Sequence, residues 1–234
     1  MPPFVAFGTA HLCALALTIF VAASIAWGVR RGDRATARTT RWALAGTILV
    51  AVSVEIARGA AEGWLTLEAV VPLHLCDAAL LLSVGGLLWP RRWLAEVLYY
   101  WTLGATSIAM LFPDLAVGFP RWEFVIFFAL HGLAIVAAGT LVLGMGLTPR
   151  RGSALRVFAI TNTYAAAVGL VNLAFGTNYL YLCAKPTNPT LLDRFGPWPL
   201  YVVLADTLAL FVFVLLELPF RRLSAGTPVA PQSP

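Results

Sequence analysis

The chain has 234 residues, of which 60% are hydrophobic and 12% are charged, and its mean hydropathy is +0.83. A soluble domain carries roughly a quarter charged residues and has no interior large enough for so much apolar surface. These values exclude a soluble enzyme or binding module, and the long apolar runs exclude a disordered or collagen-like chain. The net charge of +5 does not indicate nucleic-acid binding, because the arginines form short clusters between apolar runs. We therefore predict an all-α polytopic membrane helix bundle.

Seven apolar segments are long enough to cross a bilayer, which takes about 20 residues each. Their predicted ranges are 8–29, 42–60, 69–89, 94–112, 122–146, 155–175 and 198–219. The first segment has no charged region before it, so we predict that it is retained and not cleaved as a signal peptide. The whole of 1–222 is then one transmembrane domain, followed by a disordered cytoplasmic tail at 223–234. The connection 176–197 is too apolar for a solvated linker, and we expect it to be an ordered cap.

The basic residues orient this bundle. Twelve arginines fall on one side of a seven-span chain: Arg30, Arg31, Arg34, Arg38, Arg41, Arg91, Arg92, Arg150, Arg151, Arg156, Arg221 and Arg222. The other side has four basic residues: Arg58, Arg121, Lys185 and Arg194. The positive-inside rule therefore predicts an outside N-terminus and a cytoplasmic C-terminus.

Most polar residues inside the predicted spans share one depth. At 1.5 Å of rise per residue, His74, Cys76, His131 and Asp206 lie about 7–13 Å below the outer surface. Glu55 and Asn172 lie near the outer ends of their own spans, and Asp77 follows Cys76 directly. Because intramembrane polar groups need partners, we expect one polar pocket that opens outward beneath the cap. Taken singly, each residue is better explained by a helix–helix hydrogen bond; taken together, the pocket and the structural interpretation are about equally supported.

Two kinds of catalysis and one non-enzymatic function fit such a pocket. Cys76 as a nucleophile with His131 as its base suits acyl transfer or hydrolysis of an acyl ester, with Asn172, Asn178 or Tyr179 as oxyanion donors. His74, His131, Asp77 and Asp206 would suit a metal-assisted hydrolase, but no spacing typical of a metal-ligand motif is present. A lipid- or solute-binding protein or a transporter is the non-enzymatic alternative. A retinal protein is excluded because the lone lysine, Lys185, lies in a loop.

One disulfide, from Cys183 to either Cys13 or Cys76, can form if that loop faces an oxidising space.

Several blocks of the sequence carry a resemblance to a known family. They are VPLHLCDAALLL (71–82), LFPD (111–114), FFALHGL (127–133), TNTYAAAVGLVNLAFGTNYLYLCAKP (161–186), LLDRFGPWPLY (191–201) and LPF (218–220). In this order the chain resembles the YwaF family of bacterial integral membrane proteins, which is similar to the transmembrane protein 164 type acyltransferases. The resemblance implies a multi-pass protein of the bacterial cytoplasmic membrane, with membrane lipids as partners and no cofactor.

The resemblance also implies residue roles. The membrane-embedded Cys and His of the acyltransferase relatives would fall on Cys76 and His131. From their place in the predicted pocket, we expect His74, Asp77 and Asp206 to support this pair. This is the same pair that the depth of the residues suggests. The LYLCAKP block at 180–186 departs from the family pattern, and that departure concerns the cap rather than the pair.

Overall fold

The computed structural model describes residues 2–224 and is helical almost throughout. Seven helical spans are long and apolar enough to cross a membrane, which makes the chain a multi-pass membrane protein. The spans are α1 (Thr9–Arg31), α2 (Arg34–Glu62), α3 (Leu67–Val70) with α4 (Leu75–Leu88), α5 (Arg92–Tyr100) with η1 (Trp101–Thr106) and α6 (Ser107–Leu111), α7 (Trp122–Gly139) with η2 (Thr140–Gly144), α8 (Ser153–Phe175) and α9 (Leu200–Ser224). Two short turns, η3 (Tyr179–Tyr181) and η4 (Leu191–Phe195), lie in the connection before α9. Of the predicted tail 223–234, residues 225–234 lie outside the described residues.

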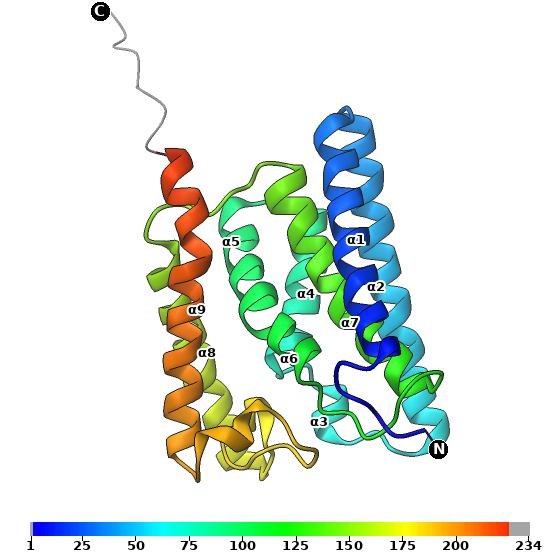
Figure 1. Cartoon of the computed structure of the whole chain (residues 1–234), viewed down its shortest axis with the longest axis vertical. Helices are drawn as coiled ribbons and strands as arrows, with labels where there is room; N and C mark the ends of the chain where they lie inside the picture. The colour runs from blue at the N-terminus through cyan, green and yellow to red at the C-terminus, as the bar shows by residue number, and fades with distance from the viewer. Residues whose placement is uncertain (1, 225–234) are drawn as a thin grey trace, which may run out of the picture.

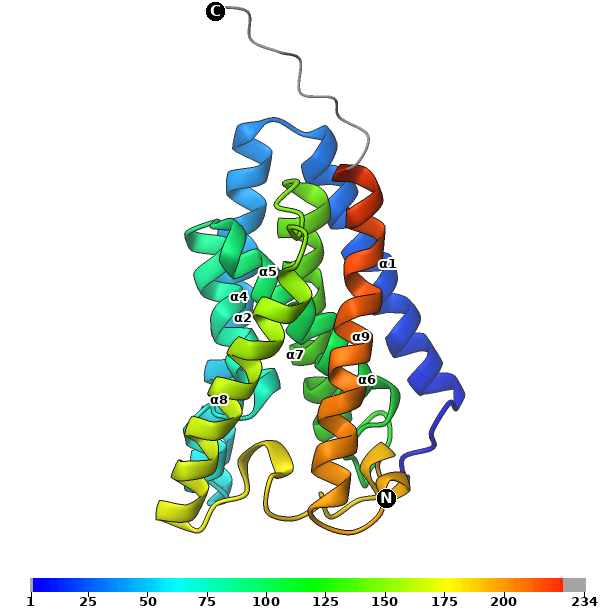
Figure 2. The same cartoon turned by 90° about the vertical axis from the view of Figure 1, so that its left-hand side faces the viewer.

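The bundle has a central layer between two helix pairs. Figure 1 shows α1 and α2 on one side, α8 and α9 on the other, and α4 to α7 between them; Figure 2 views the bundle from the side of α8 and α9. Burial agrees with this arrangement, because 67% of the fourth span and 56% of the fifth are buried, against 17% of α1, α8 and α9. The main core cluster accordingly includes Leu98, Tyr100, Ala137 and Leu141 of these two central spans.

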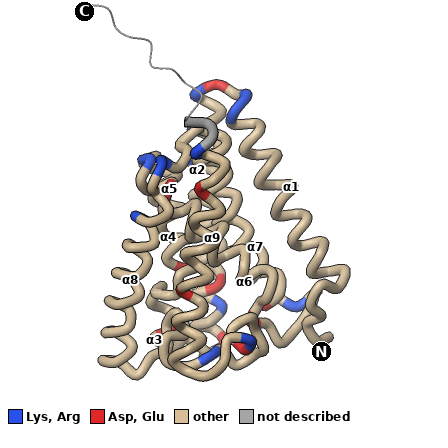
Figure 3. Tube along the Cα trace, turned by 60° about the vertical axis from the view of Figure 1, so that its left-hand side comes forward, with Lys and Arg blue, Asp and Glu red and all other residues tan. Residues whose placement is uncertain are grey.

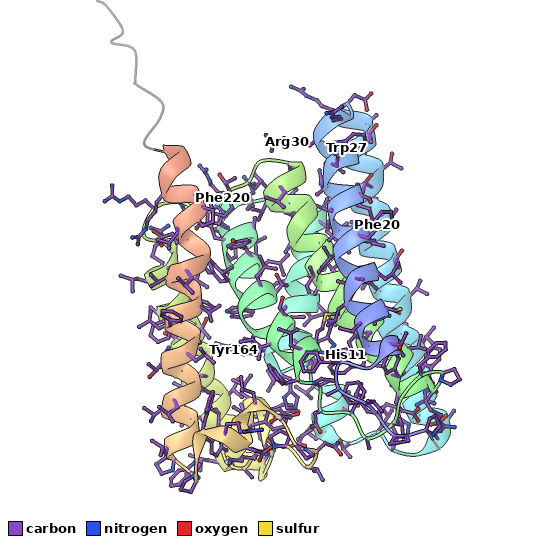
Figure 4. All side chains as sticks on the ribbon, in the orientation of Figure 1. His11, Phe20, Trp27, Arg30, Tyr164 and Phe220 are labelled. Atoms are coloured by element: carbon purple, nitrogen blue, oxygen red, sulfur yellow. The ribbon has the colours of Figure 1, made fainter. Side chains whose placement is uncertain are left out.

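The outer faces of the peripheral helices are apolar and unpaired within the chain. Phe20 is 69% exposed and Leu173 is 81% exposed, and Figure 4 shows Phe20 pointing away from the bundle. An exposed apolar surface of this extent suits a lipid environment, where helices need no polar face.

The second span begins earlier than its hydropathy predicts. Asp33 caps α2 by accepting hydrogen bonds from the amide and the hydroxyl of Thr36, both at 2.8 Å. These hydrogen bonds lower the pKa of Asp33. The helix therefore starts at Arg34 rather than near residue 42, and its first two turns carry arginines. Figure 1 shows the α1–α2 hairpin projecting beyond the ends of α5 and α7.

Candidate functional site: a membrane helix that begins beside a cysteine

The third span is broken into two helices. Pro72 lies in the non-helical stretch between α3 and α4. With 14 residues, α4 is about 21 Å long and cannot cross a hydrocarbon core of about 30 Å alone. The N-terminus of α4 therefore lies inside the apolar layer.

The first amides of α4 have no acceptor. His74 is the N-cap residue, and its side chain makes no capping hydrogen bond. The first amide with a partner is that of Ala78, which donates to the His74 carbonyl at 2.9 Å. Within residues 2–224, the amides of Leu75, Cys76 and Asp77 donate to no group. Unpaired amides at a helix N-terminus form a ready site for negative charge.

Cys76 lies in this first turn, beside the fourth span. The Thr106 hydroxyl donates to the Cys76 sulfur at 3.8 Å, and Thr106 is fully buried at the end of the π-helical turn η1. Such π-helical turns are frequent at functional sites. Asp77 follows in the same turn. Thr106 is not among the candidates predicted from the sequence, because hydroxyl residues inside apolar spans are too common to single it out.

The connection after α8 covers this helix start. The His74 ring packs against the rings of Tyr179 and Tyr181, with centroids 5.3 and 5.5 Å away, and the Leu180 amide donates to His74 Nδ1 at 3.4 Å. Leu180 and Tyr181 have φ of 59° and 53°, a left-handed backbone that side chains rarely adopt. The packing on His74 helps to fix this strained turn.

Asp114 of the LFPD block holds the same connection from the other side. One of its carboxylate oxygens accepts from the Tyr181 hydroxyl at 3.1 Å, and the other accepts from the amide and the side chain of Asn188. Burial raises the pKa of Tyr181, and the neighbouring Asp114 carboxylate raises it further. Tyr181 therefore stays protonated and remains a donor to Asp114. The sequence analysis included Asp114 only as part of a family motif.

Three of the predicted pocket residues build this cap. Asn172 donates to the Tyr179 carbonyl and accepts from the Tyr179 amide, both at 2.9 Å. The Tyr179 hydroxyl donates to the Leu67 carbonyl, and Asn178 bonds the backbone at residues 183 and 184. Since their donors are engaged, these residues serve the cap more naturally than an oxyanion. The unpaired amides of α4 are better placed for that role.

His131 lies mid-span on α7, which packs against α4. Its ring stacks on Phe127 with centroids 4.0 Å apart, and Nδ1 is 2.8 Å from the Phe127 carbonyl oxygen. Because a carbonyl only accepts, Nδ1 carries the proton and leaves the Nε2 lone pair free. Within the described residues, no hydrogen bond joins His131 to Cys76.

Asp206 and Glu55 have hydrogen-bond partners other than Cys76 within the described residues. Asp206 of α9 accepts from Asn162 of α8 at 3.1 Å. Glu55 of α2 accepts from the Trp122 indole at 2.7 Å. The single outward-opening pocket stays a prediction for these two residues, because depth along a helix does not say which way a side chain points. Among residues 2–224, no three His, Cys, Asp or Glu side chains are grouped to hold a metal, so the donor set of the metal-assisted alternative is not assembled.

Three further observations correct or extend the sequence analysis. Cys13, Cys76 and Cys183 are all free, so neither disulfide is formed. His11 is not among the candidates predicted from the sequence. It is buried, and both of its ring nitrogens are hydrogen-bonded: it accepts from the Phe7 amide and donates to the Met110 carbonyl at 2.8 Å. Figure 4 places it on α1, facing the bundle. Two surface hollows of the described residues, one at the start of α2 and one beside the start of α1, include neither Cys76 nor His131 in their lining.

Comparison with known proteins adds a family. The TMEM164 family model matches residues 6–217. An uncharacterized protein of Treponema pallidum (strain Nichols) is 29% identical over 158 residues, which cover 67% of this chain and 64% of that protein. The chain thus matches less than two thirds of the length of this relative. No solved structure matches the chain.

Proposed function

The chain belongs to the TMEM164 family, and we propose that it is an acyltransferase or hydrolase that acts on lipid acyl esters through Cys76. The observation that carries this proposal is the position of the Cys76 thiol. It lies in the first turn of a helix that begins inside the membrane, next to three amides that have no acceptor among residues 2–224. In an apolar layer such amides are costly unless they meet a ligand or water.

The proposed reaction follows from these groups. The Cys76 sulfur bonds the carbonyl carbon of a lipid ester while its proton passes to a base. The carbonyl oxygen becomes an oxyanion that accepts hydrogen bonds from the amides at the start of α4. The ester C–O bond then breaks, the base returns the proton to the leaving alcohol, and a thioester remains on Cys76. A second alcohol, or water, takes the acyl group in the same way.

His131 is our candidate for the base. Its Nδ1–H is held by the Phe127 carbonyl, which leaves Nε2 ready to accept a proton. Catalytic hydrogen bonds are often absent or long before the substrate binds, and the role requires that Nε2 approach the Cys76 sulfur in the loaded enzyme. The resemblance to acyltransferases supports the same pair. His74 is less suited because its Nδ1 already accepts from the cap.

The non-catalytic alternative is a lipid- or solute-binding membrane protein. The hydrogen bonds of Asn172, Asn178 and Asp206 favour it, because they join the cap to itself and to α8, and α8 to α9. Under this alternative, Cys76 has no covalent role.

The experiment is intact-mass analysis of the purified full-length chain after incubation with a mixed phospholipid extract and an acid quench. We expect an acyl-sized mass increase that hydroxylamine removes, and its loss in Cys76→Ala. The matched controls are Cys13→Ser and Cys183→Ser, which remove exposed thiols and should leave the adduct in place. His131→Ala should slow acylation by roughly 10²–10⁴-fold, as removal of a general base does.

Two results would contradict the proposal. An adduct that persists in a folded Cys76→Ala protein would place the chemistry elsewhere. If the wild type shows no adduct and the lipid composition is unchanged after prolonged incubation, the binding alternative gains the support.

A further inference from the structure

A basic recess lies at the end of the molecule opposite the candidate site. It has a volume of about 470 Å³ and is formed where the start of α2 meets the ends of α4 and η2. Its lining includes Arg34, Arg38, Arg41, Trp42, Leu88 and Met145. Figure 3 shows basic residues gathered at this end, around the α1–α2 turn and the neighbouring connections.

The arginines of the recess have no acidic partner. Arg34, Arg38 and Arg41 follow one face of α2 at helical spacing. Within the described residues, no carboxylate pairs with any of them, and the side chains of Arg34 and Arg38 make no hydrogen bond. The acidic residue next to them in the sequence, Asp33, is occupied by Thr36. Adjacent cations without a counterion repel one another, and an anion bound between them removes that repulsion.

Arg41 is fixed in place by the backbone. Its Nε donates to the Leu87 carbonyl at 2.6 Å and its Nη2 to the Leu88 carbonyl at 3.1 Å. These carbonyls belong to the last turn of α4, where helices have free acceptors. The Arg34 and Arg38 side chains are therefore exposed and unpaired within the described residues, whereas the anchored Arg41 forms part of the wall of the recess.

The recess lies at the level expected for lipid headgroups. Four exposed tryptophans surround this end of the bundle, as the aromatic belt of a membrane protein does: Trp27, Trp42, Trp89 and Trp93. Figure 4 shows Trp27 close to Arg30 near the end of α1. Leu88 and Met145 give the recess an apolar side next to its cationic side. A ligand that carries both a phosphate and an acyl chain matches this combination.

We propose that this recess binds the headgroup of an anionic phospholipid. The phosphate accepts charge-assisted hydrogen bonds from Arg34 and Arg38, which suit it because the guanidinium group donates in pairs to phosphate oxygens. The first segment of the acyl chain lies along Leu88 and Met145. Basic recesses between membrane helices are a known form of headgroup recognition. This proposal is independent of the chemistry proposed at Cys76.

The test compares the binding of phosphatidylglycerol and phosphatidylcholine to the full-length chain in neutral detergent. Retained lipid is counted by native mass spectrometry, and the unfolding temperature is measured in each lipid and in inorganic phosphate. We expect the wild type to retain phosphatidylglycerol and to gain thermal stability from it. The double variant Arg34→Gln/Arg38→Gln should bind it at least roughly tenfold more weakly, a modest loss for two charged hydrogen bonds.

The matched control is Arg91→Gln/Arg151→Gln, which removes two exposed arginines of the same basic side that do not line the recess. It should keep the wild-type affinity and the wild-type rise in unfolding temperature. An equal loss in both double variants would overturn the site in favour of a general charge effect. Equal retention of the two lipids by the wild type, or equal stabilisation by inorganic phosphate alone, would overturn a headgroup site. If the double variant unfolds at a lower temperature than the wild type in phosphatidylcholine, the test still stands. The rise in unfolding temperature from phosphatidylcholine to phosphatidylglycerol is then compared between the two proteins.

Discussion

At the scale of single residues, two buried carboxylates fix the turn between η2 and α8. Glu96 of α5 accepts from the Arg150 amide at 2.8 Å and from two nitrogens of its guanidinium at 2.7 and 2.8 Å. The Glu96 carboxylate raises the pKa of Arg150 through these bonds. Glu217 of α9 is also fully buried and serves the same turn. The sequence alone indicates that a charged residue inside an apolar span, such as Glu96, needs a partner. It does not indicate that the partner is Arg150, 54 residues further along the chain.

The second carboxylate gives a residue-scale prediction. Glu217 accepts from the amides of Gly152 and Ala154, both at 2.9 Å, and from Arg221 at 2.6 Å. Glu217→Gln turns one acceptor into a donor that faces these donors. We expect it to lower the free energy of unfolding by about 1–3 kcal/mol, the penalty for an unsatisfied buried polar group. Denaturant unfolding in detergent measures this, with the exposed Glu62→Gln as the control. An equal effect of both substitutions would show that the buried contact is not the cause.

At the scale of elements, hydropathy predicts the spans well and their interiors poorly. Each of the seven predicted apolar runs lies in a helical span, although α2 begins eight residues before its run, because crossing a membrane needs about 20 apolar residues whatever the fold. The break at Pro72 is also visible in the sequence, since proline lacks an amide hydrogen. The π-helical turns η1 and η2 are not, because they depend on packing between helices. Consequently Thr106 could not be placed beside Cys76 from the sequence.

The packing of η1 gives an element-scale prediction. A methyl group on Gly104 would lie 2.6 Å from the Phe213 ring of α9, whereas one on Gly85 of α4 would meet nothing within 4 Å. Gly104→Ala should therefore lower the free energy of unfolding by about 1–3 kcal/mol through overpacking. Gly85→Ala should be neutral or stabilising by up to about 1 kcal/mol, because alanine favours a helix. Thermal unfolding of the two variants in the same detergent measures this difference in stability. A Gly104→Ala protein as stable as the wild type would mean that α9 is not pressed against η1.

At the scale of the whole molecule, the two ends differ in chemistry. One end has the cap, with its tyrosines and asparagines, over the start of α4. The other end has the basic recess, the aromatic belt, and the turn between η2 and α8 that Glu96 and Glu217 hold. Loop charges revealed the basic end in the sequence, because they follow directly from the order of spans. The cap could be expected from its length and composition, but its contacts with His74 and Asp114 join segments far apart in the chain.

This polarity leads to a prediction about orientation in the membrane. If the arginine-rich end is cytoplasmic, the cap faces outward together with Cys183, which is exposed and free. In a Cys13→Ser/Cys76→Ser background, a membrane-impermeant maleimide should label Cys183 in intact cells. When Cys183 is also replaced by Ser and the exposed Arg151 by Cys, labelling should require disruption of the membrane. The reverse pattern would invert the molecule, and the proposed lipid ester would then have to reach Cys76 from the cytoplasmic side.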